Sequence, residues 1–141
     1  MGVPKNERRE SRVEFDNNYF RIYDDAIRLI ECGFGSKDDS KRWYTSLMSK
    51  AIIESVTTLG TYIRIANSIY PIYKTELEER RLYQDKAIGL CYDLMTKYQL
   101  VMTELRVPDD KHTDEIKHLI HEINCIKKWR ASDNNRFKHL G

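Results

Sequence analysis

The spacing of apolar residues between positions 116 and 126 constrains the fold of this chain most strongly. Apolar side chains recur there every three or four positions, as Ile116, Leu119, Ile120, Ile123 and Ile126. This spacing places them on one face of an α-helix, and such a helix must bury that face against other elements. The segment therefore predicts a bundle helix. Glycine and proline number only 6 and 3 among 141 residues, which suits long helices better than short strands.

Three further segments show the same helical period. We predict helices from about residue 18 to 32, from about 41 to 66, from about 75 to 105 and from about 111 to 131. Turn-forming residues separate these segments, namely Gly33-Phe34-Gly35, Pro71 and Pro108-Asp109-Asp110. The polar run Ser132–Asn135 is expected to end the last helix. Gly60, inside the second segment, is expected to allow a close contact between helices.

Each of the first three segments carries its own stripe of expected core residues. They are Tyr19, Phe20, Tyr23, Ile27 and Ile30; then Leu47, Met48, Ile52, Val56, Leu59, Ile63 and Ala66; then Ala87, Cys91, Leu94, Tyr98, Val101 and Leu105. Extending the third stripe toward its start gives Gln84, Arg80 and Leu77. Two polar side chains on an apolar seam mean either that this end of the helix protrudes beyond the core or that it meets a partner.

The length and the short connections predict the architecture. A chain of 141 residues is the size of one domain, and short linkers favour antiparallel neighbours. We therefore predict an all-α fold, an antiparallel up-down-up-down four-helix bundle over residues 15–131. In this prediction residues 1–14 are a charged, mobile leader and residues 132–141 are a mobile basic tail.

Residues that could catalyse a reaction or bind a metal do not converge in the sequence. Glu115 and His118 have the Glu-x-x-His spacing of di-iron bundles, and His121 follows, but no second such pair exists. On a helical wheel centred on the apolar stripe, both histidines project from the opposite face. Cys125 lies four residues after His121, a spacing that is more often accidental than catalytic. We predict no enzyme activity, no catalytic residue, no metal and no cofactor.

The sequence also lacks the signals of membrane insertion or export. No apolar run approaches the length of a transmembrane helix, and the first residues have no apolar signal region. The three cysteines are odd in number and far apart, which favours reduced thiols over a disulfide framework. We predict a cytoplasmic protein that does not associate with membranes.

Charge is distributed unevenly although the formal net charge is only +2. The C-terminal end interleaves cations with aromatic rings, in Lys127, Lys128, Trp129, Arg130, Arg136, Phe137 and Lys138. Cations can bind phosphates and aromatic rings can stack on bases, so this basic end is a candidate nucleic-acid surface. Positive charge also suits a helix C-terminus, and a merely solvated charge run is an equal alternative.

The helix order resembles a known family of four-helix-bundle proteins. The resemblance rests on Leu77-Glu78-Glu79-Arg80-Arg81-Leu82 early in the third helix and on Glu122-Ile123-Asn124-Cys125-Ile126-Lys127-Lys128-Trp129 in the last helix, after a short first helix and a longer second and third. The family includes the accessory variability determinants of diversity-generating retroelements and the proteins encoded by 23S rRNA intervening sequences. The resemblance covers residues 15–131. Family members often have small glycines before the last tryptophan, where this chain has Lys127 and Lys128.

The resemblance implies a non-enzymatic accessory subunit. Accessory determinants of this family form homopentamers with a basic surface, and they bind the element's reverse transcriptase and template RNA to support mutagenic cDNA synthesis. Carried onto this chain, the cationic contacts would be Arg80, Arg81, Lys86, Lys127, Lys128 and Arg130. The basic end adds Arg136 and Lys138 as candidate nucleic-acid contacts. The alternative from another class is a helical protein-interaction adaptor, with a tyrosine-rich face, that binds no nucleic acid.

Overall fold

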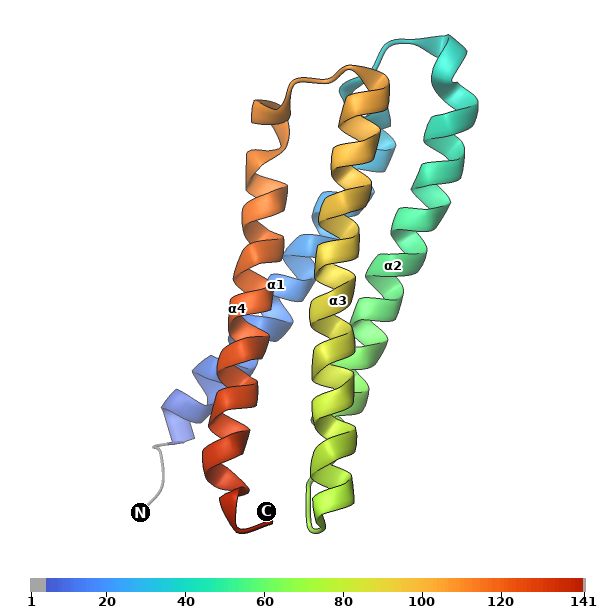
Figure 1. The fold of residues 1–141 in the computed structure, drawn as a ribbon. Helices are drawn as coiled ribbons and strands as arrows, with labels where there is room; N and C mark the ends of the chain where they lie inside the picture. The colour runs from blue at the N-terminus through green and yellow to red at the C-terminus, as the bar shows by residue number, and fades with distance from the viewer. Residues whose placement is uncertain (1–4, 141) are drawn as a thin grey trace.

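The computed structural model describes residues 5–140 and folds them into four long α-helices (Figure 1). These are α1 (Lys5–Glu31), α2 (Arg42–Ser68), α3 (Lys74–Leu105) and α4 (Thr113–Arg136), with short 3₁₀ turns η1 (Gly33–Gly35), η2 (Asp39–Lys41), η3 (Asp109–His112) and η4 (Lys138–Leu140). The described residues contain no strand, so the all-helical prediction is confirmed. No helix among them has both the length and the apolar character needed to cross a membrane.

The helices form one bundle with an oblique member. Figure 1 shows α2, α3 and α4 side by side, while α1 crosses behind them. The α2–α3 pair has the most extensive contact, and α1 packs against both α4 and α2. All four helices and Phe34 of η1 contribute side chains to one continuous core. The core therefore closes through α1 on the far side of the α2–α3–α4 layer.

The turn after α1 lies where the sequence predicts it. Gly33, Phe34 and Gly35 all have positive φ angles, of 60°, 57° and 83°. Glycine adopts this left-handed region without steric cost, whereas Phe34 is held there because its ring is buried in the core. α1 ends at Glu31, which confirms that this glycine-flanked turn terminates the first helix.

Two predicted helix boundaries are wrong. The predicted leader is helical from Lys5 onward, because its lysine, glutamate and arginine residues are good helix formers; the first helix is therefore not short. α4 does not break at Ser132–Asn135 but continues to Arg136. Asp133 is fully buried there and accepts hydrogen bonds from α3, so tertiary contacts override the weak helix propensity of the segment.

The predicted core stripes have mixed outcomes. The α3 stripe from Ala87 to Leu105 is wholly buried, and so is the α2 stripe from Ile52 to Ala66. Some predicted core residues are instead exposed; these are Phe20, Tyr23, Leu47 and Ile120. α1 buries a different face, which consists of Phe15, Asn18, Ile22, Asp25, Ala26 and Leu29. A simple apolar count misses this face because two of its buried members are polar.

Gly60 allows α1 to approach α2 closely, as predicted. The hydroxyl of Tyr19 in α1 donates a hydrogen bond to the Val56 carbonyl oxygen at 2.9 Å. A Cβ atom added at Gly60 would lie 2.6 Å from Cζ of the Tyr19 ring. Because real side chains do not approach this closely, any larger residue must displace the tyrosine and break its hydrogen bond.

We expect Gly60→Ala to lower the free energy of unfolding by about 1–3 kcal/mol, because the added methyl group overpacks the α1–α2 contact. Urea denaturation monitored by circular dichroism measures this change. The matched control is Gly89→Ala in α3, where an added Cβ meets nothing within 4 Å. That change should raise stability by about 0.5–1 kcal/mol through helix propensity alone. Equal effects of the two substitutions would contradict the close contact.

Candidate nucleic-acid interface

A buried ion pair joins α3 to the C-terminal end of α4. Arg80 donates to Asp133 twice, from Nε to Oδ2 at 2.7 Å and from Nη2 to Oδ1 at 2.9 Å. Nη1 donates to the Ile69 carbonyl oxygen at 2.8 Å, and Gln84 donates to Asp133 Oδ2 at 2.9 Å. The side chains of Arg80 and Asp133 are only 6% and 0% exposed. This geometry ties α3, α4 and the α2–α3 connection together.

This pair corrects two expectations about the start of α3. Arg80 and Gln84 occupy the apolar seam because Asp133 of the same chain accepts their hydrogen bonds, and the helix end neither protrudes nor needs an outside partner there. Arg80 is therefore not a surface cation that could contact a nucleic acid. Its donors are engaged, and its charge is offset by the buried Asp133 carboxylate.

The aromatic residues of the predicted basic end also lie inside the fold. The guanidinium of Arg80 lies 5.0 Å from the Trp129 ring centroid and 5.8 Å from that of Phe137. Trp129 stacks on Phe15 of α1, with 4.8 Å between centroids and 6° between planes. Phe137 is buried. These two rings stabilise the end of the bundle and cannot stack on bases, which corrects the expectation that they interleave with surface cations.

Two of the predicted cations lie along the seam between α3 and α4. Arg81 donates from Nη2 to Asn134 Oδ1 at 2.6 Å. Arg130 forms an ion pair with Asp85, with 2.7 Å between Nη1 and Oδ1. The charge of Arg130 is therefore partly offset, whereas the neutral amide of Asn134 leaves the charge of Arg81 in place.

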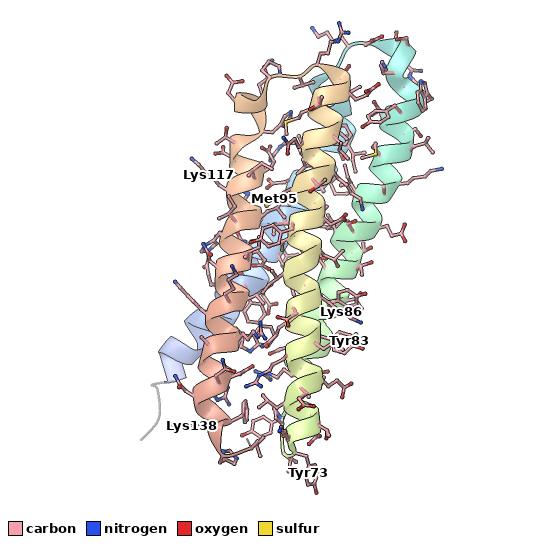
Figure 2. The ribbon with its side chains drawn as sticks, in the orientation of Figure 1. Tyr73, Tyr83, Lys86, Met95, Lys117 and Lys138 are labelled. Atoms are coloured by element: carbon pink, nitrogen blue, oxygen red, sulfur yellow. The ribbon has the colours of Figure 1, made fainter. Side chains whose placement is uncertain are left out.

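Lys86 belongs to a different surface. Its ammonium group lies 5.5 Å from the Tyr62 ring centroid and 5.2 Å from that of Tyr83, so it bridges α2 and α3 by cation–π contacts (Figure 2). The structure thus does not bring the eight predicted cations together. It buries Arg80, separates Lys86 and places the others along α4 and its seam with α3.

The remaining four predicted cations are exposed along the last turns of α4 and in η4. We call Lys127, Lys128, Arg136 and Lys138 the terminal cations. Among the side chains that the structure describes, no carboxylate lies within ion-pair distance of any of them. Lys127 shares a helical face with Arg130 and Asn134, since the three are spaced i, i+3 and i+7. Lys128 projects about 100° further around the helix.

The Glu-x-x-His pair lies against α1 instead of facing solvent. His118 Nδ1 contacts Asp25 Oδ2 at 2.5 Å, and Arg28 binds both Asp25 and Glu115, at 2.9 Å and 3.1 Å. The wheel placement of His118 on the opposite face is therefore wrong. These residues form an ion-pair network between α1 and α4. Within the described residues, no group of three or more histidine, cysteine or carboxylate side chains is arranged to hold a metal ion.

Cys125 and His121 do meet, but the contact does not activate the thiol. Their Sγ and Nε2 atoms are 3.6 Å apart, and the same nitrogen contacts Glu14 Oε1 at 2.7 Å. Burial, together with the nearby carboxylate of Glu122, raises the pKa of Cys125 to about 11. Because a nucleophilic cysteine needs its thiolate at neutral pH, this pair lacks the electrostatics of a catalytic dyad.

Glu122 is a buried acid that periodicity did not reveal. It is fully buried beside Asn18, whose Nδ2 donates to Glu122 Oε1 at 3.2 Å and to the His118 carbonyl oxygen at 2.8 Å. Burial, with smaller contributions from Asp16 and Glu14, raises the pKa of Glu122 to about 8. Glu122 Oε2 and Asn18 Oδ1 have no hydrogen-bond partner in the described part. A protonated Glu122 carries a donor for that amide oxygen.

We expect Asp133→Ala to lower the free energy of unfolding by about 3–5 kcal/mol, because it leaves the Arg80 charge buried and unpaired. Thermal or urea denaturation measures the loss. Asp85→Ala is the matched control, since it breaks the partly exposed pair with Arg130 and should cost no more than about 1 kcal/mol. A loss for Asp133→Ala as small as that of the control would contradict a buried, stabilising pair.

The buried Glu122 predicts a pH-dependent stability. Its folded pKa of about 8 lies above the ordinary value of 4.5. The unfolded chain therefore releases this proton first, and the stabilisation present below pH 4.5 is lost as the pH rises to about 8. The slope approaches about 1.4 kcal/mol per pH unit within that window.

The variant Glu122→Gln keeps an acceptor for the Asn18 side chain but has no group that titrates at this position. We expect the difference in unfolding free energy between wild type and Glu122→Gln to grow steadily in favour of the variant from pH 5 to pH 8. Denaturation across this range measures it, with Gln in place of the exposed Glu54 as the control. A difference that stays constant with pH would show that Glu122 is ionised throughout.

Comparisons with known proteins found no relative. No protein-family model, no curated protein and no solved structure matches the chain. The resemblance to the retroelement family therefore rests on the residues quoted above, since α1 and α2 both have 27 residues and the short first helix of that pattern is absent. What this chain does has to be inferred from where its charges and aromatic rings lie.

Proposed function

We propose that this protein is a non-enzymatic RNA-binding subunit that assists the reverse transcriptase of a diversity-generating retroelement. The terminal cations carry this proposal, because four exposed lysine and arginine side chains lie along the last turns of α4 and in η4 with no described carboxylate to neutralise them. Such groups bind phosphates and release the counterions condensed on the nucleic acid. The family resemblance supplies the partner enzyme and the template RNA.

A rigid support for the terminal cations is consistent with a binding surface. α4 stays helical through Arg136 because Asp133 is buried and bound by Arg80, and Trp129 is packed between Phe15 and Arg80. Lys127, Lys128 and Arg136 are therefore presented from a folded helix, and Lys138 from the short turn η4 that follows it. Fixed charges lose less entropy on binding than charges on a mobile segment.

The proposed activity is contact with the RNA backbone. Phosphate contacts position a protein but carry no direct sequence information. Because four cations per chain make a modest site, assembly into the homopentamer that the resemblance implies would multiply the affinity. We also propose that the four helices follow an antiparallel up-down-up-down order, which the short connections favour, and that the protein is cytoplasmic.

One observation favours the alternative, a protein-interaction adaptor. Trp43 and Leu47 lie one turn apart on α2, and their side chains are 62% and 59% exposed. An exposed apolar pair of this kind is typical of protein-binding surfaces. In this alternative the terminal cations only solvate the helix end, and the protein binds no nucleic acid.

The double charge reversal Lys127→Glu with Lys128→Glu tests the RNA proposal. We expect it to weaken binding of a structured RNA at least tenfold, and to reduce the slope of log affinity against log salt by about 1.5, because two phosphate contacts are lost. Fluorescence anisotropy across a salt series measures both quantities.

Lys117→Glu with Lys50→Glu is the matched control. It reverses two exposed lysines, of which Lys50 belongs to α2. Figure 2 shows Lys117 on the upper part of α4, far from Lys138. The control makes the same change in net charge. Equal weakening by both variants would assign RNA binding to overall charge, and unchanged binding by the first variant would refute the site.

A further inference from the structure

The connection between α2 and α3 exposes three large side chains within four residues. Tyr73, Tyr70 and Ile72 are 69%, 66% and 64% exposed, the highest fractions among the large hydrophobic side chains that the structure describes. Pro71 between them is buried. We call residues 70–73 the aromatic loop. A cluster of large apolar side chains exposed to solvent is typical of a binding surface.

The aromatic loop is held in place on both sides. The carboxylate of Glu76 accepts hydrogen bonds from the backbone N–H groups of Ile72 and Tyr73, at 3.1 Å and 2.9 Å. Arg80 binds the Ile69 carbonyl oxygen directly before the loop. The ring of Tyr70 packs edge-on against Phe137, with 5.7 Å between centroids. The loop therefore presents its rings in a fixed geometry before any partner arrives.

Three cations lie close to the loop in the sequence or through its contact with Phe137. Lys74 follows Tyr73 directly, and both Lys74 and Lys138 are exposed. Arg136 lies 5.1 Å from the ring of Phe137, on which Tyr70 packs. Figure 2 shows Tyr73 and Lys138 at the same end of the bundle. The carboxylate of Glu76 is engaged by the loop backbone, and the exposed carboxylates of Glu78 and Glu79 lie further along α3.

We infer that the aromatic loop binds unpaired bases of the RNA, while Lys74, Arg136 and Lys138 contact the adjoining phosphates. This inference rests on the proposed RNA-binding function and specifies the form of RNA that the site takes. Tyrosine rings stack on the faces of bases whatever their identity, and a phosphate-binding rim beside them follows the backbone. A duplex hides its base faces in the stack, so this site requires a single-stranded segment.

The test compares one oligonucleotide in two forms. A fluorescein-labelled oligoribonucleotide of mixed sequence and about 12 nucleotides, a typical site size, is used single-stranded and annealed to its complement. The full chain carries Tyr73→Ala alone, or Tyr70→Ala with Tyr73→Ala. We expect a loss of single-strand affinity of about tenfold per ring, with duplex affinity changed less than twofold. The corresponding Tyr→Phe variants should bind as wild type, because phenylalanine keeps the stacking face.

The control variant is Tyr92→Ala, which removes an exposed ring from α3 outside the aromatic loop. Tyr73→Ala keeps the test valid if the double variant is unstable, since the contact with Phe137 is made by Tyr70. Unchanged single-strand affinity in Tyr73→Ala, together with weaker binding in the Lys127 and Lys128 reversal, overturns this inference but leaves the proposed function in place. The loop would then be assigned to a protein partner. No binding of either RNA form by wild type at low salt refutes both.

Discussion

The end of the bundle depends on the buried contact between Arg80 and Asp133. Two hydrogen bonds, at 2.7 Å and 2.9 Å, join α3 to α4, and a third bond from Arg80 to Ile69 fixes the α2–α3 connection. Because a buried arginine without its carboxylate is very unfavourable, this contact selects the arrangement in which α4 continues as a helix to Arg136. The positions of Arg136, Lys138 and the aromatic loop follow from it.

The same contact explains why the charged residues of this chain have different roles. Arg80 and Arg81 are neighbours in sequence, yet Arg80 is buried between two rings and a carboxylate while Arg81 reaches the neutral Asn134. Sequence gives both the same charge. Only the fold shows that one holds the structure together and that the terminal cations, which lack described carboxylate partners, are available to a polyanion.

The sequence predicted the parts of the fold that follow from a clean apolar period. The α3 stripe and the lower α2 stripe are buried as expected, and Gly60 lies at a close contact. The buried face of α1 was not predictable in this way, because Asn18 and Asp25 occupy core positions whose partners lie about a hundred residues away. The true end of α4 was not predictable either, because Asp133 is held in the helix by Arg80, a residue far away in the sequence. At the candidate site, Lys127 and Lys128 are exposed as expected although α4 continues beyond them to Arg136, whereas the aromatic loop gave no signal beyond Pro71.

The central claim is that the terminal cations bind phosphates, and the salt dependence of RNA binding by the unmodified protein tests it most directly. Anisotropy titrations of a structured RNA between about 50 and 200 mM salt give the slope of log affinity against log salt. Four phosphate contacts predict a slope of about −3 per chain. An affinity that does not change with salt, or no binding at the lowest salt, would contradict the account and favour a protein-binding adaptor.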